Sequence, residues 1–204
     1  IGREGTGVRT FFSGHTSIGQ YPIYRFGNEE QRERYLPRSV RGEIILAFGL
    51  TEPDAGSNPL EMTSTYRRDG DHYVLNGVKQ CITSGKNGDV AIVMAVTDKA
   101  AGKRGISAFL VPTHTPGYTV ARLEDKMGQH ASDTAQILFE NCRVPASCLL
   151  GEEGMGLKIA LSGLEGGRIG IASQAVGMAR AAFEAALSYA KERSSFGQPI
   201  FNHQ

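Results

Sequence analysis

Two short segments bring hydroxyls and glycines together in a pattern that could bind an acceptor-rich ligand. The first, Thr51-Glu-Pro-Asp-Ala-Gly-Ser57, follows the apolar run 44–50, and the second, Ile82-Thr-Ser-Gly85, ends another apolar run. Proline has no N–H to donate, and glycine lets the backbone approach a partner closely. Each segment therefore predicts a buried strand that stops in a tight loop with backbone N–H groups and hydroxyls on offer. Either loop alone is typical of a solvated turn, whereas the pair favours a binding site.

Other kinds of site have little support in the sequence. The segment Gly151-Glu-Glu-Gly-Met-Gly156 lacks the G-x-G-x-x-G spacing of a nicotinamide site, and no βαβ unit follows it. There is no G-x-S-x-G elbow of a hydrolase. The five histidines have no metal-ligand spacing, and Cys81, Cys142 and Cys148 form no C-x-x-C pair. We therefore expect no metal site and no disulfide framework, and the cysteines fit a reducing compartment.

The charge balance gives no sign of a polyanionic partner. The 204 residues include 22 basic and 21 acidic side chains, which leaves a net charge of +1, and 40% of the residues are apolar. We expect no nucleic-acid partner and no membrane span, because no apolar run is long enough to cross a bilayer. The chain has no initiating Met, and we expect it to be part of a longer one.

The elements that would position the two loops change type along the chain. Asn28 and Gln31 have the spacing of a helix capping box, and Pro37 and Gly42 predict the end of that helix. From residue 44 the apolar period becomes two, and Asp69-Gly70 and Asn76-Gly77 predict turns between strands. The predicted strands cover residues 44–50, 63–68, 71–75, 78–83, 90–97, 106–111, 118–123 and 135–139.

Helical periodicity returns after Gly154 and continues to the end. Strands at short spacing without intervening helices favour antiparallel pairing. The predicted fold is therefore α+β, an antiparallel β-sandwich or barrel flanked by helical segments. One face of the last helical segment is apolar, and we expect it to pack in a core; its residues are Ala172, Val176, Ala179, Phe183, Ala186 and Ala190.

The two loops also resemble the flavin-binding signature of the acyl-CoA dehydrogenase family, a Gly-hydrophobic-Thr-Glu-Pro-x-x-Gly-Ser loop followed by an Ile-Thr-x-Gly strand end. The likeness runs through the chain, as in Phe26-Gly-Asn-Glu-Glu-Gln31, Met127-Gly-Gln129 and Glu192-Arg-Ser-Ser-Phe-Gly197, and short-chain-type members look closest. It implies three parts: the end of an N-terminal helical domain (1–43), a middle β domain (44–152) and the start of a C-terminal helical bundle (153–204).

The resemblance implies FAD-dependent α,β-dehydrogenation of an acyl-CoA thioester to the trans-2-enoyl-CoA. In this family a carboxylate removes the α proton, the β carbon gives a hydride to FAD, and an electron-transfer flavoprotein takes the electrons. A homotetramer or homodimer is expected, in the bacterial cytoplasm or the mitochondrial matrix. Two alternatives stay open: a flavin-dependent oxidase or monooxygenase of the same superfamily, and a non-catalytic flavin or acyl-CoA binding module.

Carried over residue by residue, the resemblance places FAD at the two loops and at the end of the chain. Thr51 would bond the edge of the flavin and Thr83 its reacting end, while Arg193 and Gln204 would reach the FAD of a neighbouring subunit. The expected FAD-binding residues are Phe48, Gly49, Leu50, Thr51, Gly56, Ser57, Cys81, Ile82, Thr83, Arg193, Ser195, Phe196, His203 and Gln204, and the expected substrate-binding residues are Ser57, Glu165 and Arg168.

Three departures from the family pattern bear on function. Cys81 occupies a position where many members carry an aromatic ring against the flavin, and Asn58 replaces a more usual Asp. No residue matches the catalytic base. Most members carry this Glu in a part that would lie beyond Gln204, and a minority carry it at the position of Gly167. We therefore predict no catalytic base within these residues.

Overall fold

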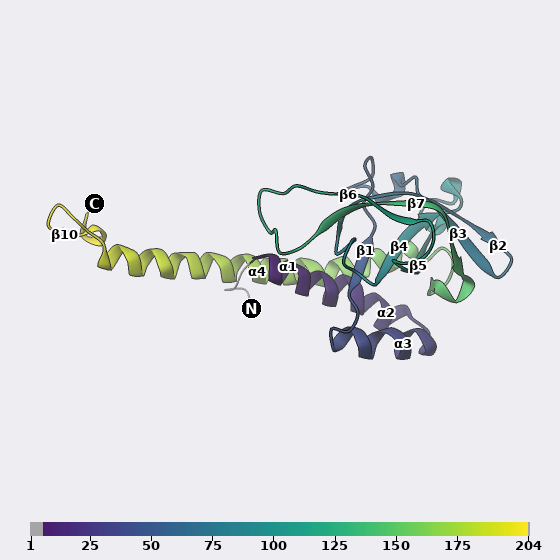
Figure 1. Ribbon diagram of the computed structural model, residues 1–204, viewed down its shortest axis with the longest axis horizontal. Helices are drawn as coiled ribbons and strands as arrows, with labels where there is room; N and C mark the ends of the chain where they lie inside the picture. The colour runs from purple at the N-terminus through teal and green to yellow at the C-terminus, as the bar shows by residue number, and fades with distance from the viewer. Residues whose placement is uncertain (1–5, 204) are drawn as a thin grey trace.

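The computed structural model describes residues 6–203 and combines helices with one large sheet (Figure 1). A group of N-terminal helices lies beside the sheet, and one long helix runs from the sheet out to the C-terminus. Within the described residues, no helix has both the length and the apolar character needed to cross a bilayer. The α+β class predicted from the sequence is confirmed.

Consecutive helical segments form the N-terminal part. They are α1 (Thr6–Ser13), a π-helical segment (Gly14–Gln20), α2 (Tyr21–Phe26) and α3 (Glu29–Val40). Position 19 requires a glycine, because a Cβ there would collide with the Leu46 side chain of the first strand. The helices therefore approach the sheet closely at this point.

The capping box predicted for α3 is confirmed, and the helix ends just before Gly42 as predicted, but Pro37 does not stop it. Asn28 Oδ1 accepts a hydrogen bond from the Gln31 N–H at 2.8 Å, and Gln31 Oε1 accepts one from the Asn28 N–H at 3.2 Å. Pro37 lies inside α3, where it forfeits one backbone hydrogen bond without ending the helix. The chain turns away only at Gly42, whose φ of 72° is left-handed.

One eight-stranded sheet forms the middle of the chain, in the order β6-β7-β3-β2-β4-β5-β8, with β1 beside β4. Most neighbours are antiparallel, as predicted, but β1 runs parallel to β4. Parallel neighbours need a long connection, and here β2 and β3 lie between them in sequence. The strands are β1 (Leu46–Gly49), β2 (Thr65–Asp69), β3 (His72–Thr83), β4 (Val90–Val96), β5 (Ile106–Pro112), β6 (Tyr118–Leu123), β7 (Thr134–Pro145) and β8 (Leu149–Leu150).

The predicted turn at Asn76-Gly77 is wrong, because β3 continues through it. The long strand β7 pairs along both halves of β3, and the register shifts between Leu75 and Gly77. Gly77 has a φ of 141°, and a Cβ at this position would collide with Ser64. The glycine therefore marks a bulge that bends one long strand, a second use of glycine in strands besides turns.

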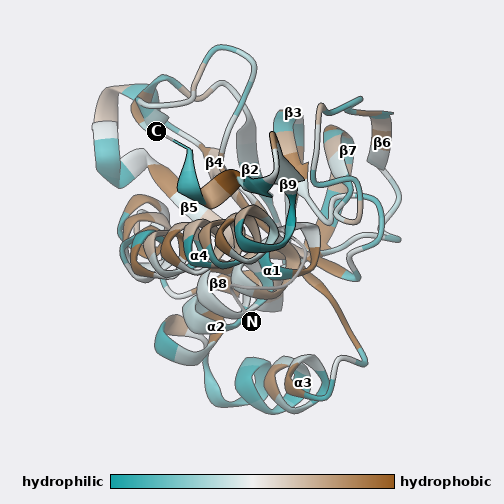
Figure 2. Cartoon of the chain, turned by 90° about the vertical axis from the view of Figure 1, so that its left-hand side faces the viewer, coloured by the Kyte–Doolittle hydropathy of each residue, from teal (hydrophilic) through white to brown (hydrophobic). Residues whose placement is uncertain are grey.

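Two apolar cores lie on opposite faces of the sheet and meet at β4, whose residues are all buried. Alternate side chains of a strand point to opposite faces. Ala91, Val93 and Ala95 pack with residues of β3 and β7, whereas Ile92 and Met94 pack toward the helices. Figure 2 shows the apolar colour of β4 above the long helix. Because β4 is buried on both faces, its neighbour β1 also lies in the interior of the protein.

The long helix α4 (Gly156–Glu192) packs on the sheet with its first half only. Gln174 is its last buried residue, and beyond it the helix extends away from the rest of the described chain (Figure 1). The apolar face predicted to pack in a core is exposed here, with Val176 at 69% and Phe183 at 66%. A helix face needs a partner element to become a core, and residues 6–203 supply none along this stretch.

Candidate active site

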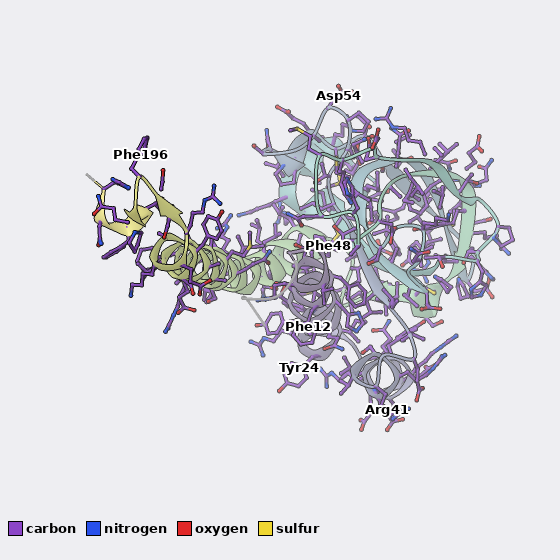
Figure 3. All side chains as sticks on the ribbon, turned by 60° about the vertical axis from the view of Figure 1, so that its left-hand side comes forward. Phe12, Tyr24, Arg41, Phe48, Asp54 and Phe196 are labelled. Atoms are coloured by element: carbon purple, nitrogen blue, oxygen red, sulfur yellow. The ribbon has the colours of Figure 1, made fainter. Side chains whose placement is uncertain are left out.

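A cavity of about 250 Å³ lies where the two predicted loops meet. Its walls come from β1 and the loop after it, from the end of β3, and from the helical segments on one side. Figure 3 shows Phe48 of β1 between the helices and the strands. The lining residues are Gly14, His15, Ile18, Leu46, Phe48, Leu50, Thr51, Gly56, Cys81, Ile82, Thr83, Ser84 and Leu164.

Backbone pairing holds the two loops side by side. The Gln80 N–H donates to the Thr51 carbonyl at 2.8 Å, which joins the first loop to β3. Directly after this bond the register of β3 shifts between Lys79 and Ile82, and Cys81 adopts a left-handed φ of 59°. Bulges of this kind re-aim side chains and recur beside active sites. The bulge leaves the Cys81 thiol exposed at the cavity wall.

A buried ion pair beneath the first loop was not predicted from the sequence. Lys79 Nζ lies 2.7 Å from Glu52 Oε1, and both side chains are almost fully buried. Lys79 also donates to the Leu50 carbonyl at 3.2 Å, and Glu52 accepts from the backbone N–H groups of Thr63 and Ser64. One charged pair therefore fixes the backbone on both sides of Thr51. The only signal in the sequence is that Lys79 falls at an inward position of a strand.

Burial and pairing act in opposite directions on this pair. Burial alone would raise the pKa of Glu52, but the Lys79 charge and the hydrogen bonds to the carboxylate outweigh it and lower that pKa to about 2. Burial lowers the pKa of Lys79, and the Glu52 carboxylate opposes this change. The geometry favours the ionised form of both groups, because each has hydrogen-bond partners that suit its charged state.

His15 also lines the cavity, but its ring serves the fold. Its Nδ1 accepts from the Leu46 N–H at 3.1 Å, and its Nε2 lies 2.9 Å from the Ser39 carbonyl, so the network assigns the proton to Nε2. The side chain is buried and connects β1 with α3. Since both ring nitrogens bond to the backbone, His15 is a poor candidate for a general base.

The lining of this cavity fits an isoalloxazine ring. Phe48, Leu50 and Ile82 give apolar surface for a flat ring, and Thr51 and Thr83 offer hydroxyls for its polar edges. Neither hydroxyl makes a hydrogen bond to another residue that the structure describes. Sites of this type are apolar with a few well-placed polar groups. These residues could therefore hold the flavin of FAD.

A second cavity, of about 300 Å³, adjoins the first, and the two share Gly14, Ile18, Thr83 and Leu164. It lies between α1, the π-helical segment and α4. Its remaining lining residues are Thr10, Ser13, Ser17, Gly167, Arg168 and Ile171. Among residues 6–203, no Asp or Glu lines either cavity. Gly167 lines the second cavity. The position that could carry an internal base therefore has no side chain that could remove a proton.

A larger groove, of about 700 Å³, lies on the other side of α4. Four cationic side chains line it, Lys103, Arg104, Lys158 and Arg168, together with one carboxylate, Glu165. Arg168 lines both this groove and the second cavity. Of the two residues of α4 expected at the substrate, the structure thus places Arg168 between the two hollows and Glu165 in the groove alone.

Several expected site residues lie outside the first cavity. Gly49 is buried in β1, and Ser57 is exposed on the loop. Arg193, Ser195, Phe196 and His203 lie at the far end of α4, where Figure 3 places Phe196. From Leu164 to Arg193 the helix rises by about 44 Å. Within residues 6–203 these side chains do not meet the cavity, and Gln204 lies outside the described residues.

The end of the chain folds on itself locally. Strands β9 (Ser194–Ser195) and β10 (Gln198–Pro199) form a hairpin whose turn places Phe196 and Gly197 at left-handed φ values of 49° and 80°. His203 Nε2 lies 3.0 Å from the Ser195 carbonyl. Phe196 is 97% exposed. The expected role of this hairpin at a second subunit's cofactor stays a prediction.

Three family models match the chain in sequence order. They are the N-terminal domain of acyl-CoA dehydrogenase over residues 1–43, the middle domain over 47–142 and the C-terminal domain over 154–204. This chain belongs to the acyl-CoA dehydrogenase family. An acyl-CoA dehydrogenase of Bacillus subtilis is 46% identical to this family member over 204 residues, all of the chain and 54% of the relative. The chain thus spans about half the length of the curated relatives it matches.

Solved structures of the family have the same fold. Butyryl-CoA dehydrogenase from Megasphaera elsdenii is 44% identical with a TM-score of 0.96, covering 100% of this family member and 53% of that chain. A glutaryl-CoA dehydrogenase from Mycobacterium smegmatis in complex with FADH2 is 44% identical with a TM-score of 0.91, covering 98% and 50%. A structure described as the electron transferring flavoprotein of Acidaminococcus fermentans matches at 46% identity and a TM-score of 0.97, covering 100% and 53%.

Proposed function

We propose that the full-length protein is an FAD-dependent acyl-CoA dehydrogenase that acts on short-chain acyl-CoA thioesters. The proposal rests on Thr83, which lines both the flavin-type cavity and the adjoining cavity. A flavin ring in the first and an acyl chain in the second would meet at this residue. Membership of the family and the 44% sequence identity to butyryl-CoA dehydrogenase support the same proposal.

The residues of the two cavities would bind, orient and exclude water. FAD, when bound, would supply the hydride acceptor, and the protein positions it. Thr51 and Thr83 would donate hydrogen bonds to the polar edges of the ring. Ile18, Leu164 and Ile171 would pack on the acyl chain, and each methylene buried there contributes about 0.8 kcal/mol. The dry walls would also strengthen the bonds to the thioester oxygen, which gathers negative charge as the α proton leaves.

The large groove is the proposed place for the coenzyme A part of the substrate. Phosphate groups need cations, and Lys103, Arg104 and Lys158 line the groove together with apolar residues of α4. Arg168 lies at the boundary between the groove and the acyl cavity, where it could donate hydrogen bonds to the substrate near its thioester. An Arg suits this role because its planar fork bonds two oxygens at once.

The missing carboxylate is the main condition on this proposal. The acyl cavity has Gly167 where a minority of the family carries the base, and no Asp or Glu is among the described residues that line it. The full-length enzyme would need a Glu from a segment other than the cavity lining. The second candidate function, a non-catalytic flavin or acyl-CoA binding module, applies to a full-length protein without such a Glu.

Partners, assembly and location follow as parts of the same proposal. An electron-transfer flavoprotein would take the electrons, and the structural match to a chain described under that name supports it. A homotetramer or homodimer would let the hairpin around Arg193 reach a neighbour's FAD. The bacterial cytoplasm or mitochondrial matrix would be the site of action, and the three-part division at residues 43 and 152 would hold in the full-length protein.

Anaerobic mixing of the purified full-length holoprotein with butyryl-CoA tests the proposal. We expect the visible absorbance of the flavin to bleach and to recover faster with an electron-transfer flavoprotein than with O₂. Recovery that is faster with O₂ would favour an oxidase. Bound flavin that butyryl-CoA and other short acyl-CoA thioesters leave unbleached would refute the dehydrogenase and favour the binding module.

A further inference from the structure

Arg9, on α1, has a guanidinium N–H that no described residue satisfies. Its Nη1 is buried without a hydrogen-bond partner, while its Nη2 donates to the Gly170 carbonyl of α4 at 3.2 Å. Among residues 6–203 no carboxylate forms an ion pair with Arg9. Buried donors in proteins are almost always paired, so an exception calls for an explanation. A group that is absent from these residues is one such explanation.

The position of Arg9 relates this N–H to the acyl cavity. Arg9 lies one helical turn before Ser13, and residues at this spacing are neighbours on one helix face. Ser13 is buried and lines the acyl cavity. A Cβ built on Gly170 would lie 3.1 Å from Ser13 Oγ and 3.5 Å from Arg9 Nη2, so both polar groups converge beside this glycine. Thr83 lines the same cavity and adjoins the flavin-type site, which leaves the Arg9 side as the end away from the reacting atoms.

A second unsatisfied group lies at the same end. Gln174, one turn after Gly170 on α4, is 6% exposed, and its Oε1 is buried without a partner. Its Nε2 makes only long contacts, 3.5 Å to Thr10 Oγ1 and 3.8 Å to Met178 Sδ. Arg9 Nη1, a donor, and Gln174 Oε1, an acceptor, are thus two unpartnered polar atoms behind the residues that line this end of the cavity. A plain hydrocarbon chain would leave them in that state.

We propose that the acyl group of the substrate ends in a carboxylate, so that the substrate class is the CoA monothioester of a short dicarboxylic acid. The inference rests on the proposed function, since it assigns the far end of the same acyl cavity. The carboxylate would accept from Arg9 Nη1 and lie within reach of Ser13 and Gln174. A guanidinium matches a carboxylate in geometry as well as in charge. The rest of the cavity is lined mostly by apolar surface, which would pack against the methylenes between the thioester and the carboxylate.

Two thioesters that differ only at the terminal carbon make the test. Glutaryl-CoA is butyryl-CoA with a carboxylate in place of one hydrogen of the terminal methyl. With the full-length holoprotein, calorimetry would give the dissociation constant of each, and anaerobic flavin bleaching would give the rate of each. We expect glutaryl-CoA to be preferred by about 10- to 100-fold in affinity, as for a charged hydrogen-bonded pair. Arg9→Met should abolish that preference and leave the affinity for butyryl-CoA within about twofold.

Controls separate a recognition role from a structural one. Arg9→Lys keeps the charge and should retain part of the preference, whereas Arg180→Met removes an exposed arginine of α4 and should change neither affinity. If Arg9→Met does not fold, Arg9→Gln, which can still donate to the Gly170 carbonyl, takes its place. Equal affinities for the two thioesters in the wild type, or a loss in Arg9→Met that is equal for both, would overturn the inference alone. Failure of both thioesters to bind and to bleach the flavin would overturn the proposed function and, with it, the inference.

Discussion

At the residue scale, Thr83 is notable because it lines three of the cavities. It ends β3, lines the flavin-type cavity and the acyl cavity, and also borders a polar cavity of about 290 Å³ with Lys126 and Ser132. Because its hydroxyl has no partner among the described residues, a ligand at any of these places would find a free donor. The residue type matters as much as the position, since a threonine offers a hydroxyl where most strand residues offer only hydrocarbon.

Replacing this hydroxyl should weaken the flavin site. In the full-length protein we expect Thr83→Ala to lose FAD on gel filtration or to slow flavin reduction, because a lost hydrogen bond in a dry site costs about 1–3 kcal/mol. Flavin absorbance per mole of protein and the anaerobic bleaching rate would measure both effects. Thr83→Ser keeps a hydroxyl and should stay close to wild type. Wild-type FAD content and rate in Thr83→Ala would show that Thr83 does not contact the flavin.

At the element scale, the ion pair of Glu52 and Lys79 joins the loop after β1 to the strand β3. Neither side chain reaches the cavity; instead Lys79 holds the Leu50 carbonyl and Glu52 holds the backbone at Thr63 and Ser64. The positions of Thr51 and the bulge at Cys81 depend on this connection. Removing one partner leaves a buried charge without compensation, whereas removing both can be nearly neutral.

A double-mutant cycle should reveal this dependence. We expect Glu52→Gln alone to lower the free energy of unfolding by about 3–5 kcal/mol, and Glu52→Gln with Lys79→Met to recover most of the loss. Urea titrations would measure each value. Since folding lowers the pKa of Glu52 from 4.5 to about 2, its stabilisation is complete above pH 4.5 and is lost as the pH falls toward 2. The acid sensitivity between these values should be smaller in the double variant, and an unchanged acid profile would contradict the assignment.

The bulge in β3 makes a second prediction at this scale. Gly77→Ala should lower the free energy of unfolding by about 1–3 kcal/mol, because a φ of 141° strains any L side chain and the new Cβ would collide with Ser64. Gly166→Ala is the matched control. It lies in α4 with nothing within 4 Å of a Cβ and should stabilise the protein by about 0.5–1 kcal/mol. Equal effects of the two substitutions in a urea titration would show that the bulge can relax.

At the scale of the whole molecule, the described chain leaves much of α4 without a partner. Val176, Phe183 and Tyr189 are all more than half exposed, and beyond Gln174 only the short C-terminal segments of the described chain contact α4 near its end. Contiguous apolar surface of this kind is typical of an interaction site. Within the family this part matches the C-terminal domain model over residues 154–204.

The 204-residue chain on its own should therefore self-associate through this face. We expect its mass in sedimentation equilibrium to rise with concentration, and Phe183→Glu to suppress that rise. Val40→Glu replaces an equally exposed apolar residue, 73% exposed on α3, and should leave the association unchanged. A monomer at every concentration, or equal suppression by both substitutions, would rule out this face of α4 as the site of association.

The sequence alone determined the fold class, the family and the two loops. Hydroxyls and glycines at the ends of apolar runs, and a period that changes from two to nearly four, are local signals, so they survive without knowledge of tertiary contacts. The same locality explains the errors. A glycine before Val78 reads as a turn whether it ends a strand or bends one, and only pairing with β7 decides between them.

Tertiary structure decided everything that depends on which distant segments meet. Arg9 and Gly170 are 161 residues apart in sequence, and Lys79 and Glu52 are 27 apart, so no spacing rule could connect them. Burial gives these polar groups their meaning, because an unpaired donor matters only where water cannot reach it. The same reasoning applies to the face around Phe183, whose apolar period predicts burial but does not supply the element that would cover it. The sequence thus determined which functional groups are present, and the packing of α1, α4 and the sheet determined where those groups could act.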